Sequence, residues 1–184
     1  TTAQLSRGEL HEMAGAYNCR QTRENYLQRI HDKTASLFAT TSEVGARLSG
    51  APEHIIEALR DYGYNLGMAF QIVDDILDFD ATGEEMGKPV GNDLAQGIMT
   101  LPAIIAMERH PEDDSISSLF RKPGDGDRLI RAVDLIQDSS VIEESYAVAG
   151  QFCETALKRV VALEQNPALE SLEKLVTYLV MRRG

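Results

Sequence analysis

Apolar residues recur at three- and four-residue spacings along most of this chain, which is the pattern of amphipathic helices. One such segment covers residues 26–48. Its apolar positions follow helical spacing and are Tyr26, Leu27, Ile30, Leu37, Phe38, Val44 and Leu48. Gly50 and Pro52 end this helix, and Pro52 opens a second one that we expect to run to about Phe79. Because the sequence has no convincing strand alternation and no internal repeat, the pattern predicts an all-α protein.

Shorter helices are expected on either side of these two. The first residues, up to about Ala16, look like the end of a helix, and Thr22 is a suitable N-cap for the next one. A break rich in glycine and proline covers residues 81–97. Further helices are expected over residues 100–108, 115–120, 127–137, 141–165 and from 167 onward. A chain of 184 residues can bury a sizeable core, so we expect one helical domain over residues 1–184.

The second long helix carries acidic residues within an apolar run, at Asp74, Asp75 and Asp78. A helix advances about 100° per residue, so Gln71, Asp74 and Asp78 share one narrow stripe, while Asp75 lies farther round. Carboxylates one turn apart repel each other and are costly to bury without a partner. Mg²⁺ would remove this conflict, because it prefers oxygen ligands and is often held by one or two carboxylates plus substrate phosphates. The three aspartates are therefore candidate metal ligands, and the alternative is a solvent-facing acidic edge of the helix.

Polar residues also interrupt the apolar stripe of the segment 26–48. Lys33 lies at the edge of that stripe and Thr34 lies within it. Taken alone, this pair suits a lysine whose stem covers apolar surface and a threonine bonded to its own helix backbone. Their predicted closeness to Gln71 and the aspartates favours a functional interpretation instead. Lys88, in the glycine-rich break, is either an ordinary loop lysine or a residue that closes on a substrate.

The segment 70–78 resembles the second aspartate-rich motif of the trans-isoprenyl (polyprenyl) diphosphate synthases. Other segments are similar to that family, in its order: Lys33-Thr34-Ala35, Gly87-Lys88-Pro89, Asp93-Leu94, and Gly97 followed by Thr100-Leu101-Pro102. The likeness covers nearly the whole chain. It implies a helical bundle of the isoprenoid (terpenoid) synthase type. The implied activity is a Mg²⁺-dependent prenyltransferase reaction that condenses an allylic diphosphate with isopentenyl diphosphate.

The resemblance also implies roles for single residues. Lys33 and Lys88 would bind diphosphate. Thr34 and Gln71 would line the reaction site, where their oxygens would help to stabilise a developing carbocation. Asp93 would either order the loop through a lysine or contact a metal-bound water. The departing diphosphate, and not a protein side chain, would take the final proton.

Composition narrows the choice of function. The net charge of −11 argues against a general nucleic-acid surface, which is typically basic. Lysines and metal ions would then have to attract an anionic substrate locally. The sequence holds no apolar run long enough to span a membrane. Cys19 and Cys153 form no paired motif, so a reduced cytoplasmic protein is the default expectation.

The sequence departs from the family pattern in one large respect. Family members carry two aspartate-rich motifs that face each other, and only the later one is found here. We therefore expect this chain to be the C-terminal portion of a longer enzyme, without its N-terminal helices, and to be inactive alone. Uncovered apolar faces would favour a homodimer or homo-oligomer. The alternatives are a non-catalytic partner subunit of a heteromeric synthase and a helical terpene cyclase.

Overall fold

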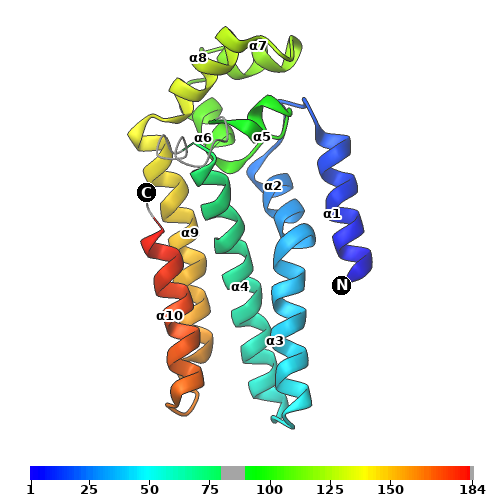
Figure 1. Ribbon diagram of the computed structural model, residues 1–184, viewed down its shortest axis with the longest axis vertical. Helices are drawn as coiled ribbons and strands as arrows, with labels where there is room; N and C mark the ends of the chain where they lie inside the picture. The colour runs from blue at the N-terminus through cyan, green and yellow to red at the C-terminus, as the bar shows by residue number, and fades with distance from the viewer. Residues whose placement is uncertain (80–89, 183–184) are drawn as a thin grey trace.

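The computed structural model describes residues 1–79 and 90–182, and within them every regular element is a helix (Figure 1). The all-α prediction is therefore confirmed. The elements are α1 (Thr2–Gly15), α2 (Arg23–Ile30), the π-helical segment η1 (His31–Ala35), α3 (Ser36–Leu48), α4 (Glu53–Leu77), α5 (Asn92–Ala95), α6 (Leu101–Arg109), α7 (Ser115–Arg121), α8 (Gly126–Ile136), α9 (Ser139–Val160) and α10 (Pro167–Met181). In the described residues no helix is long and apolar enough to cross a membrane.

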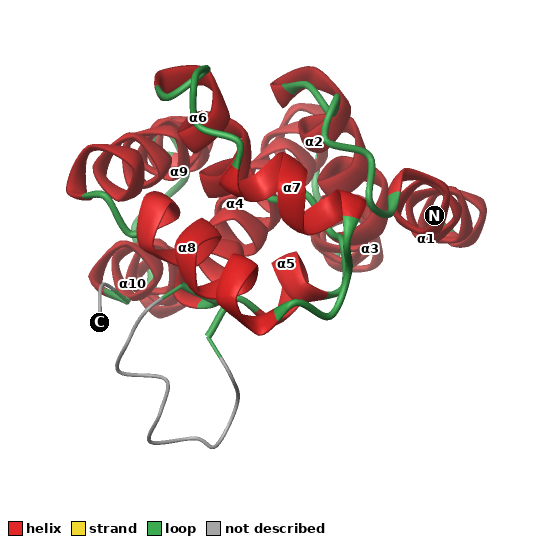
Figure 2. Cartoon of the chain, turned by 90° about the horizontal axis from the view of Figure 1, so that it is seen from above, coloured by secondary structure: helices red, strands yellow, loops and turns green. Residues whose placement is uncertain are grey.

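Helix α4 is the centre of the bundle. It packs between α3 and α9, and α10 lies on the outer side of this group (Figure 1). Its buried apolar residues, among them Met68, Ile72 and Ile76, form the middle of the core. Seen from above, α7, α8 and the short α5 lie across one end of the long helices (Figure 2). The C-terminal end of α4, which carries the aspartates, points toward that end of the bundle.

The predicted elements agree with the structure apart from three differences. The segment 26–48 contains a π-helical turn, η1, between α2 and α3. The expected break over 81–97 contains the helix α5, because the Asp78 carboxylate accepts hydrogen bonds from the backbone N–H groups of Asn92 and Asp93, at 3.2 and 3.0 Å. Helix α9 ends at Val160, before the predicted end. The predicted N-cap is confirmed, since Thr22 Oγ1 accepts from the Asn25 N–H at 3.2 Å.

Glycines let two helices approach η1 closely. A Cβ atom added at Gly8 of α1 would lie 2.6 Å from the backbone nitrogen of Lys33. One added at Gly67 of α4 would lie 2.7 Å from the Ala35 Cα. Real Cβ contacts are not this short, so any larger residue would push the helices apart. An ion pair also fixes α1, because Arg7 Nη2 lies 2.7 Å from Oδ1 of the buried Asp32. The backbone on both sides of Lys33 and Thr34 is therefore held by close packing.

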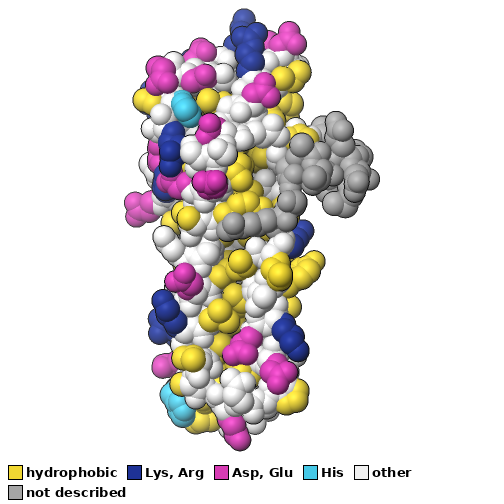
Figure 3. Space-filling model, turned by 90° about the vertical axis from the view of Figure 1, so that its left-hand side faces the viewer, with side chains coloured by type: hydrophobic (Ala, Val, Ile, Leu, Met, Phe, Trp, Pro, Cys, Tyr) yellow, Lys and Arg dark blue, Asp and Glu magenta, His cyan; other side chains and the backbone are white. Residues whose placement is uncertain are grey.

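Several residues of the predicted apolar stripes are exposed. Leu37, Val44 and Leu48 of α3 form one stripe and are 46%, 47% and 84% exposed. Exposed apolar side chains also occur on α9 and α10, including Leu157 and Tyr178. Figure 3 shows apolar side chains gathered along the side of the molecule that these two helices form. The periodicity correctly predicted the helices, but it did not distinguish a covered apolar face from an uncovered one.

Candidate active site

The predicted site residues come from two neighbouring elements, η1 and the second half of α4. Lys33 and Thr34 lie in the π-helical turn, and Gln71, Asp74 and Asp75 lie on α4. A π-helical turn is rare and is frequently found at functional sites. The close approach at Gly67 brings this turn against α4. Sequence segments more than thirty residues apart therefore meet at one place, as Thr34 and Gln71 demonstrate with a separation of 37 residues.

A chain of hydrogen bonds connects Thr34 to the interior of the protein. Thr34 Oγ1 donates to Gln71 Oε1 at 2.7 Å, and Gln71 Nε2 donates to Asp75 Oδ1 at 2.8 Å. The hydroxyl of Tyr26 donates to the other oxygen, Asp75 Oδ2, at 2.7 Å. Tyr26 is completely buried and Asp75 is 4% exposed, whereas Thr34 and Gln71 are half-buried. The predicted closeness of Thr34 and Gln71 is thus present in the structure.

Tyr26 belongs to this hydrogen-bond chain, although its place in the sequence marked it only as an apolar position of its helix. A sequence signal was available, because a buried tyrosine hydroxyl usually has a hydrogen-bond partner. Gln71 and Asp75 are also four residues apart, the spacing at which a glutamine and an aspartate on a helix bond to each other. Neither signal identifies the partner of Tyr26, which is 49 residues away in the sequence.

Burial controls the electrostatics of Asp75. It raises the pKa of Asp75 to about 7, although the hydrogen bonds from Tyr26 and Gln71 act in the opposite direction. Burial and the neighbouring Asp75 carboxylate raise the pKa of Tyr26 well above its ordinary value. The Arg29 guanidinium lies 5.5 Å from the centre of the Tyr26 ring and donates to the carbonyl of Met99 at 2.7 Å. Tyr26 is therefore a protonated donor at neutral pH.

The other two aspartates have different surroundings. Asp74 is exposed, and Asp78 is half-buried where its carboxylate caps α5. Burial raises the pKa of Asp78 to about 6. Among the described residues, no group of three or more histidine, cysteine, aspartate or glutamate side chains is arranged to hold a metal ion. The three aspartates thus differ in solvent exposure. Asp75 is buried and accepts hydrogen bonds from Tyr26 and Gln71, whereas solvent can reach the carboxylates of Asp74 and Asp78.

These surroundings indicate which aspartates suit Mg²⁺. The exposed Asp74 carboxylate offers the hard oxygen ligand that Mg²⁺ prefers. Asp78 is a second candidate because it is only half-buried, although its two oxygens accept from the Asn92 and Asp93 N–H groups. Asp75 is buried as well as bonded at both oxygens, so a metal would have to displace Tyr26 or Gln71 to reach it. The donor set fits an ion held by one or two carboxylates together with substrate phosphates.

Lys33 is ion-paired with α1. Its ammonium contacts the Glu12 carboxylate and lies 3.5 Å from Glu9 Oε2. Burial lowers the pKa of Lys33, but these two carboxylates outweigh burial and raise it. Glu12 could not be found from the sequence, because nothing in a local pattern indicates a partner on another helix. Lys88 lies outside the described residues, so only one of the two predicted diphosphate-binding lysines is placed.

Asp93 belongs to the same group of charges. Burial raises the pKa of Asp93, the carboxylates of Glu12 and Asp74 raise it further, and the cations of Lys33 and Arg29 oppose this effect. The pKa of Asp93 therefore depends on the charges of both Lys33 and Asp74. Both roles expected for Asp93, ordering the loop through a lysine and contacting a metal-bound water, stay predictions.

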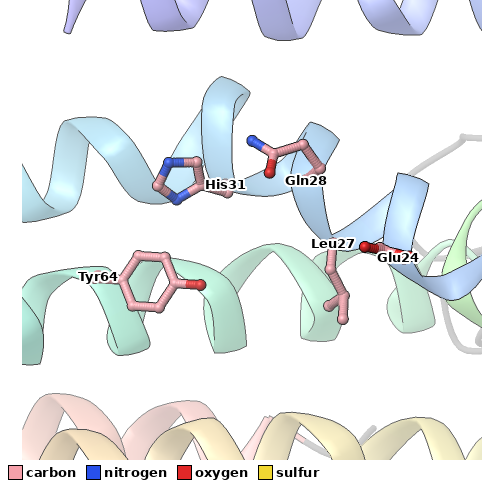
Figure 4. A pocket seen from close by; sticks show the side chains of 5 residues that line it. All are labelled: Glu24, Leu27, Gln28, His31 and Tyr64. Carbon is pink, nitrogen blue, oxygen red and sulfur yellow. The ribbon is translucent and has the colours of Figure 1, made fainter.

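A surface pocket lies beside this region, between α2, η1 and α4 (Figure 4). It is lined by Glu24, Leu27, Gln28, His31 and Tyr64. The rings of His31 and Tyr64 lie 5.3 Å apart at their centres. None of the predicted site residues lines this pocket, so the site is defined by the hydrogen-bond chain and the charges around Lys33.

The helical bundle, with a lysine, a threonine, a glutamine and aspartates at one end, defines the isoprenoid-synthase class of all-α proteins. The family model described as polyprenyl synthetase matches residues 1–136. The chain belongs to the polyprenyl synthetase family.

Similarity to named synthases and to solved structures supports this family assignment. Heptaprenyl diphosphate synthase component 2 of Bacillus subtilis (strain 168) is 37% identical over 183 residues, which are 100% of this chain and 52% of the relative. The crystal structure of heptaprenyl diphosphate synthase from Staphylococcus aureus matches with a TM-score of 0.93 at 34% identity, covering 99% of this chain and 57% of that one.

A third similar structure was solved with bound ligands. The polyprenyl synthase of Caulobacter crescentus CB15, complexed with calcium and isoprenyl diphosphate, matches with a TM-score of 0.89 at 33% identity. The matched region is 99% of this chain and 56% of the Caulobacter protein. The chain spans about half the length of the curated relatives it matches.

Proposed function

We propose that the protein containing this chain is a Mg²⁺-dependent trans-prenyltransferase that condenses an allylic diphosphate with isopentenyl diphosphate. The observation that carries this proposal is the Thr34–Gln71 hydrogen bond of 2.7 Å, beside Lys33 and one turn before Asp74. It joins two polar groups of the family pattern that are far apart in the sequence. Family membership and the calcium and isoprenyl diphosphate of the Caulobacter relative support the same conclusion.

In this proposal the residues of the chain act on the two ends of the allylic substrate. The cations of Lys33 and Lys88 bind the diphosphate and stabilise the charge of the leaving group. Mg²⁺, with Asp74 and Asp78 as its ligands, would supply further charge neutralisation when bound. Asp75, the third aspartate expected as a ligand, bonds to Tyr26 and Gln71 instead. The oxygens of Thr34 and Gln71 stabilise positive charge on the allylic carbons. The double bond of isopentenyl diphosphate then attacks, and a proton is lost to the departing diphosphate.

The chain as given supplies part of this machinery. We propose that residues 1–184 form one helical unit of a larger synthase, and that the unit is inactive alone because the other aspartate-rich motif is absent from it. The complete protein would act as a homodimer or homo-oligomer. The alternative with specific support is one subunit of a heteromeric synthase, because two relatives are named component 2 of heptaprenyl diphosphate synthase.

Incorporation of labelled isopentenyl diphosphate, with Mg²⁺ and an allylic diphosphate, tests this proposal. We expect turnover by the full-length protein, none by residues 1–184 alone, and at least a hundredfold loss in Asp74→Ala, the size of effect seen when a charge-stabilising group is removed. Asp134→Ala, an exposed aspartate on α8, is the matched control and should keep full activity.

Other outcomes separate the alternatives. Consumption of the allylic diphosphate without isopentenyl diphosphate would instead identify a terpene cyclase. A full-length protein that is inert alone but active when mixed with a second synthase component would identify a subunit. Turnover by residues 1–184 alone would contradict the expected inactivity of the unit.

A further inference from the structure

In the chain of hydrogen bonds from Tyr26 to Thr34, each group has a defined role as donor or acceptor. We propose that Tyr26 and Asp75 are positioning residues that fix the Thr34 hydroxyl as a donor to Gln71, so that its lone pairs remain for the substrate. This inference rests on the proposed prenyltransferase function. It gives Asp75 a role other than metal ligation, and it assigns a role to a buried tyrosine that is three hydrogen bonds away from Thr34.

The direction is set at Asp75. An ionised carboxylate can only accept hydrogen bonds. In the structure both oxygens of Asp75 accept: the Tyr26 hydroxyl donates to Oδ2 at 2.7 Å, and the Gln71 amide nitrogen donates to Oδ1 at 2.8 Å. The reverse orientation of the Gln71 amide would place its carbonyl oxygen against a buried carboxylate without a proton between them, which is strongly unfavourable. Asp75 thus selects one of the two amide orientations.

The amide orientation then sets Thr34. With Gln71 Nε2 facing Asp75, Gln71 Oε1 faces Thr34 Oγ1 at 2.7 Å. A carbonyl oxygen only accepts, so the threonine must use its single hydroxyl proton there. The remaining lone pairs of Oγ1 then point away from Gln71. Since Thr34 and Gln71 are half-buried while Asp75 and Tyr26 are buried, Thr34 is the end of the chain that a substrate can contact.

The consequence concerns a developing positive charge. Preorganised dipoles stabilise charge in a transition state without having to reorient during the reaction. An oxygen that presents lone pairs is attractive to a carbocation, whereas a freely rotating hydroxyl would point its proton at the cation part of the time. Tyr26 and Asp75 therefore act through Thr34 and should affect the chemical step more than substrate binding.

Kinetics of the full-length protein test whether the hydrogen bonds from Tyr26 through Asp75 and Gln71 act on Thr34. We expect Tyr26→Phe and Asp75→Asn to lower kcat about tenfold, which corresponds to one hydrogen bond. The KM values of both diphosphates and the Mg²⁺ concentration for half-maximal rate should change less than about twofold. Tyr62→Phe is the matched control, because Tyr62 is a buried tyrosine whose hydroxyl donates to the Leu172 carbonyl at 2.9 Å, and it should leave kcat unchanged.

A double-mutant cycle tests whether the effect passes through Thr34. Thr34→Ser, which keeps the hydroxyl, should retain most of kcat, and Thr34→Val should lose it. Adding Tyr26→Phe to Thr34→Val should then cause no further loss, because residues that act as one unit are not additive. Additive losses would overturn the proposal. So would a rise of tenfold or more in the Mg²⁺ requirement of Asp75→Asn, which would identify Asp75 as a metal ligand.

A second measurement is independent of activity. In full-length protein labelled with ¹⁵N-glutamine, the Gln71 side-chain amide, assigned by its loss in Gln71→Met, should show a slowly exchanging proton from its bond to Asp75. Tyr26→Phe and Thr34→Val should shift this resonance, and Tyr62→Phe should not. An unperturbed Gln71 resonance in both variants would overturn the proposal that Tyr26 and Asp75 position Thr34. Failure of the parent protein to use the two diphosphates would refute the proposed function while this measurement still tests the hydrogen bonds.

Discussion

At the scale of single residues, the ion pair of Lys33 would compete with the diphosphate that we propose this lysine binds. Its ammonium contacts Glu12 and lies 3.5 Å from Glu9, two carboxylates that compete with an anionic substrate for the same cation. Glu12 is the less exposed of the two, so solvent screens it less. The resting state thus holds Lys33 charged and in place, at the cost of a competing anion.

Removing that competitor should strengthen substrate binding. In the full-length protein, Glu12→Gln should lower the KM of the allylic diphosphate by about two- to fivefold, the range expected for one partly screened charge interaction. Steady-state kinetics with the allylic diphosphate varied measures this. Glu154→Gln, which affects an exposed pair with Lys158, is the control and should leave KM unchanged. A higher KM in Glu12→Gln would mean that Glu12 orients Lys33 and does not compete with the substrate.

At the scale of elements, the site depends on how closely α4 approaches η1. Gly67 provides this approach, since a Cβ atom there would lie 2.7 Å from the Ala35 Cα and 3.0 Å from the Phe38 Cβ. The obstructing atoms are backbone and the start of a side chain, which cannot rotate away. The same contact sets the spacing between Thr34 and Gln71 on the two elements.

The substitution Gly67→Ala should therefore destabilise the protein by about 1–3 kcal/mol, the usual cost of overpacking. Gly45→Ala is the matched control, because Gly45 lies within α3 with open space around its Cβ position. It should stabilise the protein by about 0.5–1 kcal/mol through its higher helix propensity. Chemical denaturation of both variants measures these free energies. Equal effects of the two substitutions would show that helix propensity, and not close packing, decides the result at Gly67.

At the scale of the whole molecule, the apolar stripe of α3 is left uncovered. Leu37, Val44 and Leu48 are all exposed, and Leu48 reaches 84%. Large exposed apolar patches mark interaction surfaces. The chain also spans about half of its relatives, so this stripe is the kind of surface that further helices or a second copy would cover.

Residues 1–184 alone should consequently self-associate in a concentration-dependent manner. Replacing two members of the stripe, in Val44→Lys/Leu48→Lys, should weaken the association at least tenfold, because charges would have to be buried in the contact. Ile130→Lys, at an apolar position of α8 that is 61% exposed, is the control and should leave association unchanged. Sedimentation velocity over a range of concentrations measures this. A chain that stays monomeric at high concentration would contradict the expectation.

The helical class could be predicted from the sequence alone, and so could the segments that we propose to carry the chemistry. Apolar spacing predicts helices wherever one face is apolar, and Thr22, Pro52 and Pro167 mark helix starts through their own backbone and side-chain chemistry. The motif that contains Gln71, Asp74 and Asp75, and the Lys33-Thr34 pair, are equally local. These features were predictable because each depends on residues within a few turns of one another.

Only the tertiary structure decided what each of these residues contacts. Asp74 and Asp75 are adjacent in the sequence, yet one is exposed and the other bonds to Tyr26, 49 residues away. Glu12 reaches Lys33 from α1, and Asp78 caps α5 across a separation of 14 residues. Helical periodicity gives the angle of a side chain around its own axis, but the neighbour at that angle depends on which helices pack there and how closely. The glycines at positions 8 and 67 set that distance, and so the sequence gives the functional residues while packing gives their partners.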